Sequence, residues 1–350
     1  MNARNYIYAF GVLCAGLLAG ACTQDSPKTV PPVSNEPVEI ERGTFAKGAD
    51  ISWVTELESK GELFFTPGED RTQKELMSLL RDDCGVNAIR LRVWVNPADG
   101  WCDVHDLVVK ARRAQALGLR LMVDFHFSDR WADPGKQTIP AAWEELDIDG
   151  MTAALASHVD ETLKALQRFG IEPEWVQIGN ETTTGMLWPV GHIDSGDNFT
   201  RLVNAGYDAV KAVFPEAQVI VHVDSGDSQY RFDRIFGKLA AEGGRYDIIG
   251  MSLYPDASVW RQTADACLDN IRHCRSTYGK PVMICEIGMD YREVEASEQM
   301  MNYMMSNCVS MDVKGIFWWE PEAPASEGYL KGCFDNGAPT AALNCFKSVQ

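Results

Sequence analysis

The chain has 350 residues, and 50 Asp and Glu against 32 Lys and Arg give it a net charge of −18. Hydrophobic residues make up 45% and aromatic residues 10%, which supports a sizeable core and excludes an intrinsically disordered chain. The acidic charge argues against nucleic-acid binding and against an electrostatic grip on anionic lipids, and it leaves a neutral or cationic ligand open.

The first residues have the pattern of a secretory signal. Arg4 precedes an uncharged run from Tyr6 to Ala21, and these 16 residues are fewer than the roughly 20 that a membrane span needs. The run ends in Leu18-Ala19-Gly20-Ala21-Cys22, which resembles a bacterial lipobox. We therefore expect residues 1–21 to be a lipoprotein signal peptide and Cys22 to be the lipidated N-terminus. A buried core helix is the alternative.

Residues 22–42 are expected to be a proline-rich tether. Pro27, Pro31, Pro32 and Pro37 lie among polar residues without an apolar period. The sequence thus predicts a lipoprotein that contacts the membrane through its lipid anchor only. We expect it at the outer membrane or cell surface of a Gram-negative bacterium, with a periplasm-facing protein as the alternative.

Short β-branched or aromatic runs then alternate eight times with segments of helical period. The predicted strands are Phe45–Ser52, Asn87–Val95, Arg120–Phe127, Glu174–Glu181, Gln218–Asp224, Tyr246–Pro255, Pro281–Gly288 and Lys314–Pro321. The helices between them include Asp103–Leu117, Met151–Phe169, Asn198–Val213, Val259–Tyr278 and Val294–Ser310. This α/β pattern predicts a single (β/α)8 TIM barrel over residues 43–350. An open doubly wound sheet is the alternative, but no G-x-G-x-x-G follows the first strand.

The cysteines and histidines do not suggest a cofactor or metal. Eight cysteines remain after Cys14 and Cys22, and no C-x-x-C spacing occurs. Cys333 with Cys345 is the predicted disulfide to test first, and Cys285 is expected to be a small buried apolar residue. The six histidines never fall at i, i+4, so we expect no dedicated zinc site.

Two predicted strands end in a glutamate. Strand four ends Gln177-Ile178-Gly179-Asn180-Glu181, and strand seven contains Ile284-Cys285-Glu286. Barrel enzymes react at the carboxyl ends of their strands, where a lone glutamate is often only an ion-pair partner. A pair of carboxylates about 5–5.5 Å apart, however, is what retaining glycoside hydrolysis requires, with one proton donor and one nucleophile.

The residues around these glutamates resemble family 53 of the glycoside hydrolases, the endo-β-1,4-galactanases of the retaining (β/α)8 clan. The resemblance rests on an ordered series of stretches between Phe45 and Cys345. They are Phe45-Ala46-Lys47-Gly48-Ala49-Asp50-Ile51-Ser52, Arg90-Leu91-Arg92-Val93-Trp94-Val95-Asn96-Pro97, Asp124-Phe125-His126-Phe127-Ser128-Asp129, Trp131-Ala132-Asp133-Pro134-Gly135-Lys136-Gln137, Gln177-Ile178-Gly179-Asn180-Glu181 and Phe317-Trp318-Trp319-Glu320-Pro321.

The resemblance implies Glu181 as general acid/base and Glu286 as nucleophile. Arg92 resembles the clan arginine that keeps the nucleophile charged, with Arg90 as the weaker candidate. Tyr254 resembles the tyrosine that hydrogen-bonds the nucleophile.

The resemblance also suggests how the sugar is held. Asn180 is expected to bond the sugar 2-OH, and Trp319 resembles the tryptophan beneath the reacting sugar. Asp50, His126 and Asp129 could bind sugar hydroxyls or only form structural hydrogen bonds at the barrel rim. The remaining tryptophans near strand ends are candidates for the groove or the core: Trp94, Trp131, Trp143 and Trp188. Trp318 is expected to pack against the helices.

Three functions remain open at this point. The first is a monomeric retaining endo-galactanase that binds β-1,4-galactan and galacto-oligosaccharides. The second is another clan enzyme, such as a β-mannanase or β-glucanase, and the third is a non-catalytic surface glycan-binding protein. Several family members have an Asp- and Asn-rich calcium loop after strand seven. Residues 289–299 are short and have no D-x-D-x-D run, and their acids are typical of an exposed helix start, so we expect no calcium there.

Overall fold

The computed structural model describes residues 40–348. The predicted signal peptide, the lipidated Cys22 and nearly all of the tether lie outside the described residues. Among residues 40–348, no helix is both long and apolar enough to cross a membrane.

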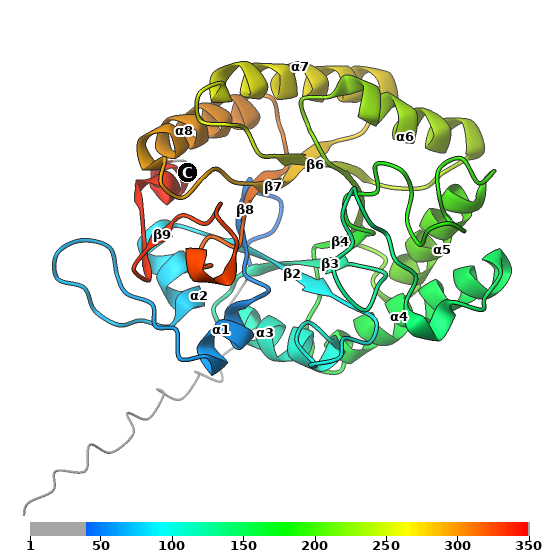
Figure 1. Ribbon diagram of the computed structural model, residues 1–350, viewed down its shortest axis with the longest axis horizontal. Helices are drawn as coiled ribbons and strands as arrows, with labels where there is room; N and C mark the ends of the chain where they lie inside the picture. Colours follow the sequence, from blue (N-terminus) through cyan, green and yellow to red (C-terminus); the bar gives the residue numbers. More distant parts are fainter. Residues whose placement is uncertain (1–39, 349–350) are drawn as a thin grey trace, which may run out of the picture. The chain divides into compact units, whose positions relative to one another are not determined.

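Eight parallel strands close into a barrel, as predicted (Figure 1). They are β1 (Ala46–Asp50), β2 (Ala88–Val93), β3 (Arg120–Phe125), β4 (Trp175–Ile178), β5 (Gln218–Val223), β6 (Ile248–Leu253), β7 (Val282–Ile287) and β8 (Gly315–Trp319). Each strand pairs with its neighbours in chain order, and β1 also pairs with β8. The fold is therefore a TIM barrel, and every predicted strand contains one of its strands.

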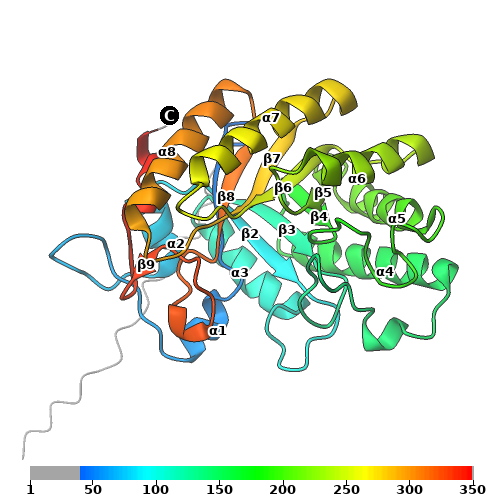
Figure 2. The same cartoon turned by 45° about the horizontal axis from the view of Figure 1, so that its top comes forward.

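Helices surround this barrel (Figure 2). They are α1 (Val54–Ser59), α2 (Leu76–Leu79), α3 (Val104–Ala116), α4 (Ile148–Gln167), α5 (Asn198–Val213), α6 (Gln229–Glu242), α7 (Trp260–Tyr278), α8 (Val294–Ser310) and α9 (Cys345–Ser348). A short π-helical turn, Leu80–Cys84, follows α2, and a small hairpin of β9 (Phe334–Asp335) and β10 (Ala338–Pro339) follows β8.

Local sequence signals set several helix ends. Asp103 precedes α3 and accepts a hydrogen bond from the amide of Asp106 at 2.8 Å, and Asp147 caps α4 in the same way. These side chains satisfy amide groups that the first helical turn leaves without a partner. At the other end, α6 and α7 stop at Gly243 and Gly279, whose φ angles of 73° and 64° favour glycine.

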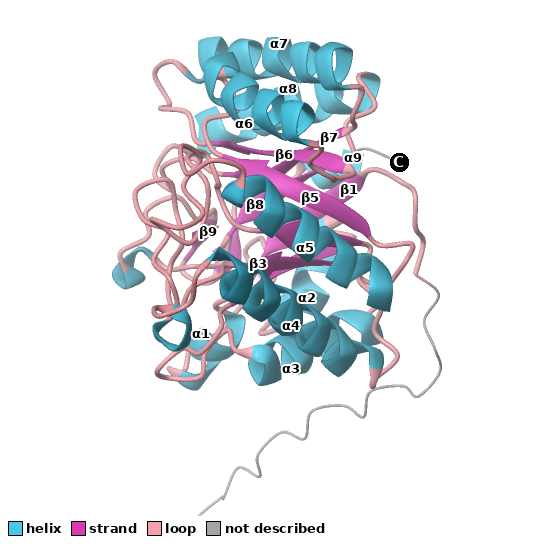
Figure 3. Ribbon diagram, turned by 90° about the vertical axis from the view of Figure 1, so that its right-hand side faces the viewer, coloured by secondary structure: helices cyan, strands magenta, loops and turns pink. Residues whose placement is uncertain are grey.

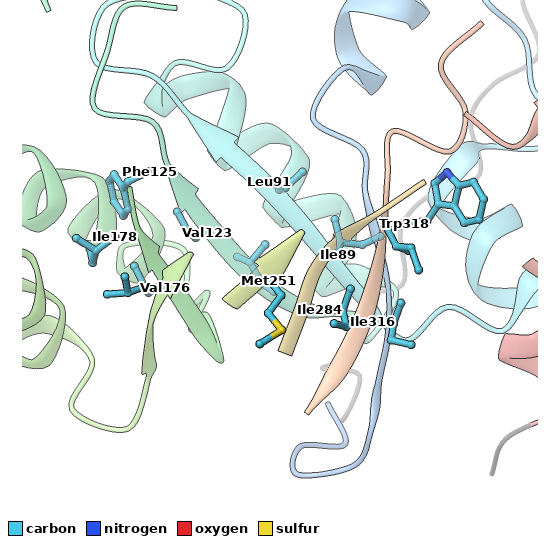
Figure 4. Packing of buried hydrophobic residues seen from close by; sticks show 14 of the residues in the cluster. Ile89, Leu91, Val123, Phe125, Val176, Ile178, Met251, Ile284, Ile316 and Trp318 are labelled. Carbon is cyan, nitrogen blue, oxygen red and sulfur yellow. The ribbon is translucent and has the colours of Figure 1, made fainter. Parts of the chain in front are cut away.

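Two hydrophobic layers hold the barrel together. Between the strands and the helices lies a large buried layer to which all eight strands contribute; Figure 4 labels ten of its residues, including Val123, Ile284 and Trp318. Trp318 is fully buried there, as expected. A smaller cluster fills the floor of the barrel interior: Ala46, Ala88, Met122, Trp175, Ile220, Ile248, Met283, Cys285 and Phe317. The interior is thus apolar at its floor, and any chemistry must lie above it.

One glycine makes room for this floor. A Cβ atom on Gly48 of β1 would lie 2.1 Å from the ring of Phe317 on the neighbouring β8. The missing side chain lets Phe317 enter the barrel and contact Trp175 edge to face, with ring centroids 6.1 Å apart.

The predicted Cys333–Cys345 disulfide is wrong for this structure. All eight cysteines of residues 40–348 are free and buried, including these two. The spacing of 12 residues said nothing about whether the two side chains point toward each other, and a disulfide requires that geometry. Cys285, in contrast, lies in the apolar floor as expected.

Candidate active site

Above the apolar floor, the barrel interior becomes polar toward the carboxyl ends of the strands. Beyond the floor, the inward-facing side chains of the strands are polar and fully buried. We call them the polar layer: Asp50, Arg90, Arg92, Asp124, Gln177, His222 and Ser252. The connecting loops gather at one end of the barrel, on the left in Figure 3. Period-two alternation explains this arrangement, because each strand turns every second residue inward.

Glu286 joins this layer through an irregularity in β7. Met283 and Cys285 both point inward in the floor, so strict alternation would turn Glu286 toward the helices. The pairing register with β6 shifts here, however: Ile284 pairs with Met251, and Glu286 pairs with the next residue, Ser252. This bulge reverses the alternation and aims the Glu286 carboxylate into the mouth of the barrel.

Arg90, and not Arg92, is the arginine that contacts Glu286. The Arg90 Nη2 lies 2.9 Å from Glu286 Oε1, and the same guanidinium pairs with Asp50 at 2.7 Å and Asp124 at 2.9 Å. Although burial opposes its charge, these carboxylates raise the pKa of Arg90 well above its ordinary value. The expected contact of Arg92 is therefore wrong, because Arg92 points to Glu320 at 2.8 Å instead.

Tyr254 supplies a second donor to Glu286. Its hydroxyl donates to Oε2 at 2.8 Å, which is the hydrogen bond expected from the sequence. Burial raises the pKa of Glu286 to about 7, while Arg90 and the Tyr254 hydroxyl oppose that rise by stabilising the carboxylate. Both carboxylate oxygens of Glu286 thus have a donor directed at the charged form.

Glu181 is held in an unusual backbone conformation beyond β4. Its φ is 44°, and the neighbouring Gly179 has a φ of 82°. Left-handed conformations are uncommon for residues other than glycine, and they cluster where the backbone must present a side chain in a particular direction. A hydrogen bond from the amide of Thr182 to the carbonyl of His222, at 2.8 Å, anchors the turn.

A short relay of hydrogen bonds meets the Glu181 carboxyl. His222 Nε2 lies 2.8 Å from Ser252 Oγ, and the Ser252 hydroxyl donates to Glu181 Oε1 at 2.7 Å. Burial lowers the pKa of His222 well below its ordinary value, so the ring is neutral. Burial and the adjacent Glu286 raise the pKa of Glu181 well above its ordinary value, although the Ser252 hydrogen bond and the charge of Arg90 oppose this rise. Burial raises the pKa of both glutamates, but only Glu286 has both Arg90 and a tyrosine hydroxyl directed at its charged form.

Asn180 and His126 are fixed beside the two glutamates. The Oδ1 of Asn180 accepts from Arg90 at 3.0 Å, and its Nδ2 donates to the carbonyl of Ala132 at 2.9 Å. His126 contacts Asp124 through Nε2 at 2.9 Å and accepts from the amide of Ala132 through Nδ1 at 3.2 Å. No acceptor within residues 40–348 takes the second N–H of the Asn180 amide, so this N–H is available to a ligand.

Arg92 is the centre of a cluster of tryptophans. Its guanidinium carbon lies 4.2 Å from the ring centroid of Trp131 and within 6.0 Å of three other indoles, namely Trp53, Trp94 and Trp319. Trp131 and Trp319 contact each other with centroids 5.7 Å apart. Arg92 is fully buried and does not line the pocket. Its role is therefore to hold the tryptophan rings in place through cation–π contacts.

A pocket of about 270 Å³ opens between these groups. Its lining is His126, Trp131, Ala132, Asp133, Asn180, Glu181, Tyr254, Glu286, Trp319, Tyr329 and Lys331. It brings together Glu181, Glu286 and five of the predicted binding residues: His126, Trp131, Asn180, Tyr254 and Trp319. Sequence reasoning missed Tyr329 and Lys331, which come from an irregular loop after β8 that has no period or motif.

Two predicted sugar-binding carboxylates do not reach the pocket. Asp50 is fully buried and is occupied by Arg90 and by the Ser52 hydroxyl at 2.6 Å. Asp129 accepts one hydrogen bond on each oxygen, from the amides of Asn96 at 3.0 Å and Ala141 at 2.9 Å. For both residues the structure thus agrees with the structural alternative, because donors of the protein itself bond their carboxylates. Trp94 and Trp143 are likewise buried.

Comparison with known proteins agrees with this architecture. An arabinogalactan endo-β-1,4-galactanase of Humicola insolens is 32% identical over 328 residues, 87% of this chain and 97% of that protein. A solved fungal β-1,4-galactanase is 30% identical with a TM-score of 0.78, covering 87% of this chain and 99% of that one. The catalytic domain of an Ignisphaera aggregans family 53 protein has a TM-score of 0.79 at 25% identity, over 89% of this chain and 98% of that one. The model of glycosyl hydrolase family 53 matches residues 46–346, and the chain belongs to this family.

Proposed function

We propose that the protein is a retaining endo-β-1,4-galactanase that cleaves galactan and type I arabinogalactan. Family membership and the galactanases among its relatives support the substrate. The observation that carries the chemistry is the pairing of Glu181 and Glu286 in one pocket, with donors to the charged form of Glu286 and burial that keeps Glu181 protonated. A glycan-binding protein has no need of both.

In the proposed first step, Glu286 attacks the anomeric carbon while Glu181 protonates the departing glycosidic oxygen. The bond from Glu286 oxygen to carbon forms as the bond from carbon to the leaving oxygen breaks, which gives a covalent glycosyl-enzyme. Arg90 and Tyr254 keep Glu286 ionised before the attack. In the second step Glu181, now a carboxylate, takes a proton from water, which displaces Glu286 and retains the anomeric configuration.

The pocket also offers groups that suit a neutral sugar. The indoles of Trp131 and Trp319 line it and can stack on the apolar face of a pyranose. The free N–H of Asn180 is placed to donate to the 2-OH, a contact that strengthens in the transition state of glycoside hydrolysis.

Hydrolysis of three purified polysaccharides tests this function. We expect potato β-1,4-galactan to be cut into galacto-oligosaccharides, and mannan and barley β-glucan to be left nearly intact, as measured by product chromatography. Release of oligosaccharides from mannan or glucan at the rate seen with galactan would assign the protein to another specificity of the clan.

The pH profile of kcat/KM is expected to be bell-shaped, with its optimum at neutral to alkaline pH. Attack requires ionised Glu286, whose pKa burial raises to about 7, so activity should fall as the pH drops through that value. Activity should also fall at high pH, once Glu181 loses its proton. Tyr254→Phe removes a donor to the carboxylate and should move the acidic limb to higher pH. A wild-type profile that stays flat from pH 7 down to pH 5 would contradict this assignment.

We further propose that the enzyme is a monomeric lipoprotein at the outer membrane or cell surface, with a periplasm-facing location as the alternative. Support comes from the uncharged run from Tyr6 to Ala21 and from the lipobox-like Leu18-Ala19-Gly20-Ala21-Cys22 at its end. Acyl chains on Cys22 would supply the membrane affinity that the acidic chain lacks.

Replacing Cys22 with Ala should release the protein from the membrane fraction, because no acyl chain can be attached. Cys14→Ala is the matched control, since this cysteine leaves with the signal peptide and its loss should change nothing. Membrane association of the Cys22→Ala protein would contradict the lipid anchor. Protease treatment of intact cells distinguishes the cell surface from the periplasm.

A further inference from the structure

A lysine ammonium in the pocket has no acceptor in the described protein. Lys331 lines the pocket beside Glu181 and Glu286, and its Nζ forms no hydrogen bond or ion pair with any residue of 40–348. The ammonium lies over the face of the Tyr254 ring, 4.6 Å from its centroid. Because Tyr254 bonds Glu286 through its hydroxyl, one aromatic ring separates the ammonium from the proposed nucleophile.

The backbone around Lys331 is fixed to the ends of β7 and β8. Its carbonyl accepts from the Trp318 indole N–H at 3.1 Å, and a Cβ on Gly288 would lie 3.1 Å from the same carbonyl oxygen. The preceding Leu330 carbonyl accepts from the amide of Tyr291 at 2.8 Å. Tyr329 packs on Trp319, with ring centroids 4.5 Å apart. The loop thus presents Lys331 from a supported position.

An ammonium that is half-buried without acceptors is costly, because water no longer satisfies its three N–H groups. The buried Lys110 shows the usual solution, with Asp106 and the carbonyl of Ser52 both at 2.7 Å from its Nζ. Burial lowers the pKa of Lys331. The charges of Glu181 and Asp290 oppose this, although neither carboxylate forms an ion pair with the ammonium. Lys331 therefore has donors to offer to a ligand.

The charge of the site selects the kind of ligand. The pocket also contains Glu181, Glu286 and Asp133, and the whole chain carries −18. The carboxylates of Glu286 and Asp133 would repel a free anion, whereas the hydroxyl oxygens of a neutral sugar can accept from the ammonium without that cost.

We propose that Lys331 is a substrate-binding residue that donates a hydrogen bond to a galactan hydroxyl next to the bond being cleaved. Its positive charge also favours the carboxylate that forms on Glu181 when the proton leaves. The inference rests on the proposed galactanase function and adds a binding group to the same site.

Three variants test this role: Lys331→Met, Lys331→Arg and the control Lys280→Met. Lys280 lies over the ring of Tyr246 at 5.2 Å, outside the pocket, so it reproduces the same lysine–tyrosine contact without a sugar nearby. The readouts are kcat and KM on β-1,4-galactan, the alkaline limb of the pH profile, and calorimetric binding of galactotetraose in a Glu286→Gln background.

Lys331→Met is expected to lower kcat/KM about 10- to 100-fold, the size expected for a lost charged hydrogen bond, and to weaken oligosaccharide binding. The alkaline limb of its pH profile should move to higher pH. Loss of the ammonium removes a positive charge that stabilises the Glu181 carboxylate, so the pKa of Glu181 rises, while its other neighbours Glu286, Asp224 and Arg90 stay in place. Lys331→Arg should retain most activity, and Lys280→Met should match the wild type.

Wild-type kcat/KM and wild-type binding in Lys331→Met would overturn the inference and leave the galactanase function standing. A wild-type protein that fails to hydrolyse galactan would contradict the proposed function instead. In that case the calorimetric arm still decides the role of Lys331, since equal binding with and without the lysine overturns it.

Discussion

Glu286→Gln and Glu181→Gln are each expected to lower kcat on β-1,4-galactan at least about 1000-fold while the barrel stays folded. In Glu286→Gln the new side-chain amide cannot attack carbon, and in Glu181→Gln it cannot donate the proton that the leaving oxygen needs. Arg90 keeps Asp50 and Asp124 as partners in Glu286→Gln, so its charge stays compensated. Initial rates of reducing-end release measure the loss, and circular dichroism checks the fold.

Substrates with different leaving groups separate the two roles. An aryl galacto-oligoside with an acidic phenol needs little protonation, so Glu181→Gln should cleave it far better than galactan, and Glu286→Gln should cleave neither. Glu322→Gln is the matched control: this glutamate is buried outside the pocket, and burial raises its pKa well above the ordinary value. Its amide variant should keep wild-type activity. Near-wild-type galactan hydrolysis by either active-site variant would remove that glutamate from its role.

Arg90→Met is expected to destabilise the protein by about 3–5 kcal/mol and to abolish most activity. Removing one partner of a buried ion pair leaves an uncompensated charge, and here three carboxylates lose their common cation at once. Glu286 would then be protonated more readily, so any residual activity should require a higher pH. Chemical denaturation measures the first effect, and the pH profile of kcat/KM measures the second.

Arg245→Met is the matched control for this substitution. The guanidinium of Arg245 also pairs with an aspartate, Asp208, and contacts the Tyr207 ring, but it lies at the surface. Exposed pairs of this kind contribute up to about 1 kcal/mol, so its loss should be small. A midpoint of unfolding in Arg90→Met equal to that of Arg245→Met would show that Arg90 is not the centre of the buried charge cluster.

The fold could be predicted because two periods alternate clearly along the chain. Each of the eight strands lies inside its predicted range, and Asn198–Val213 and Val294–Ser310 are helices with those same ends. Buried apolar strands and amphipathic helices leave this signal in local sequence. A disulfide between Cys333 and Cys345 would leave no such local signal, and this prediction was wrong.

The polar layer of the site was harder to predict, because period two places Arg90 and Arg92 on the same face. Which of them meets Glu286 depends on the stagger between distant strands. The bulge in β7 matters as well, since simple alternation would have pointed Glu286 at the helices. Asp129 shows a related limit: its sequence position suggested the pocket, but two loop amides take its oxygens.

Lys331 and Tyr329 could not have been found from pattern alone. They lie in an irregular loop, and their position depends on tertiary contacts such as the hydrogen bond between Tyr291 and Leu330 and the packing of Tyr329 on Trp319. Residues that reach a site from irregular loops have no period to reveal them, although such loops commonly carry binding groups.

Proton NMR of β-1,4-galactan hydrolysis tests the central claim most directly. If Glu286 forms a covalent intermediate and Glu181 then activates water, the new reducing ends must appear first as the β-anomer and only later equilibrate with the α-anomer. Early spectra dominated by the β-anomer signal are the predicted result. Reducing ends that appear first as the α-anomer would contradict the double displacement and the roles given to both glutamates.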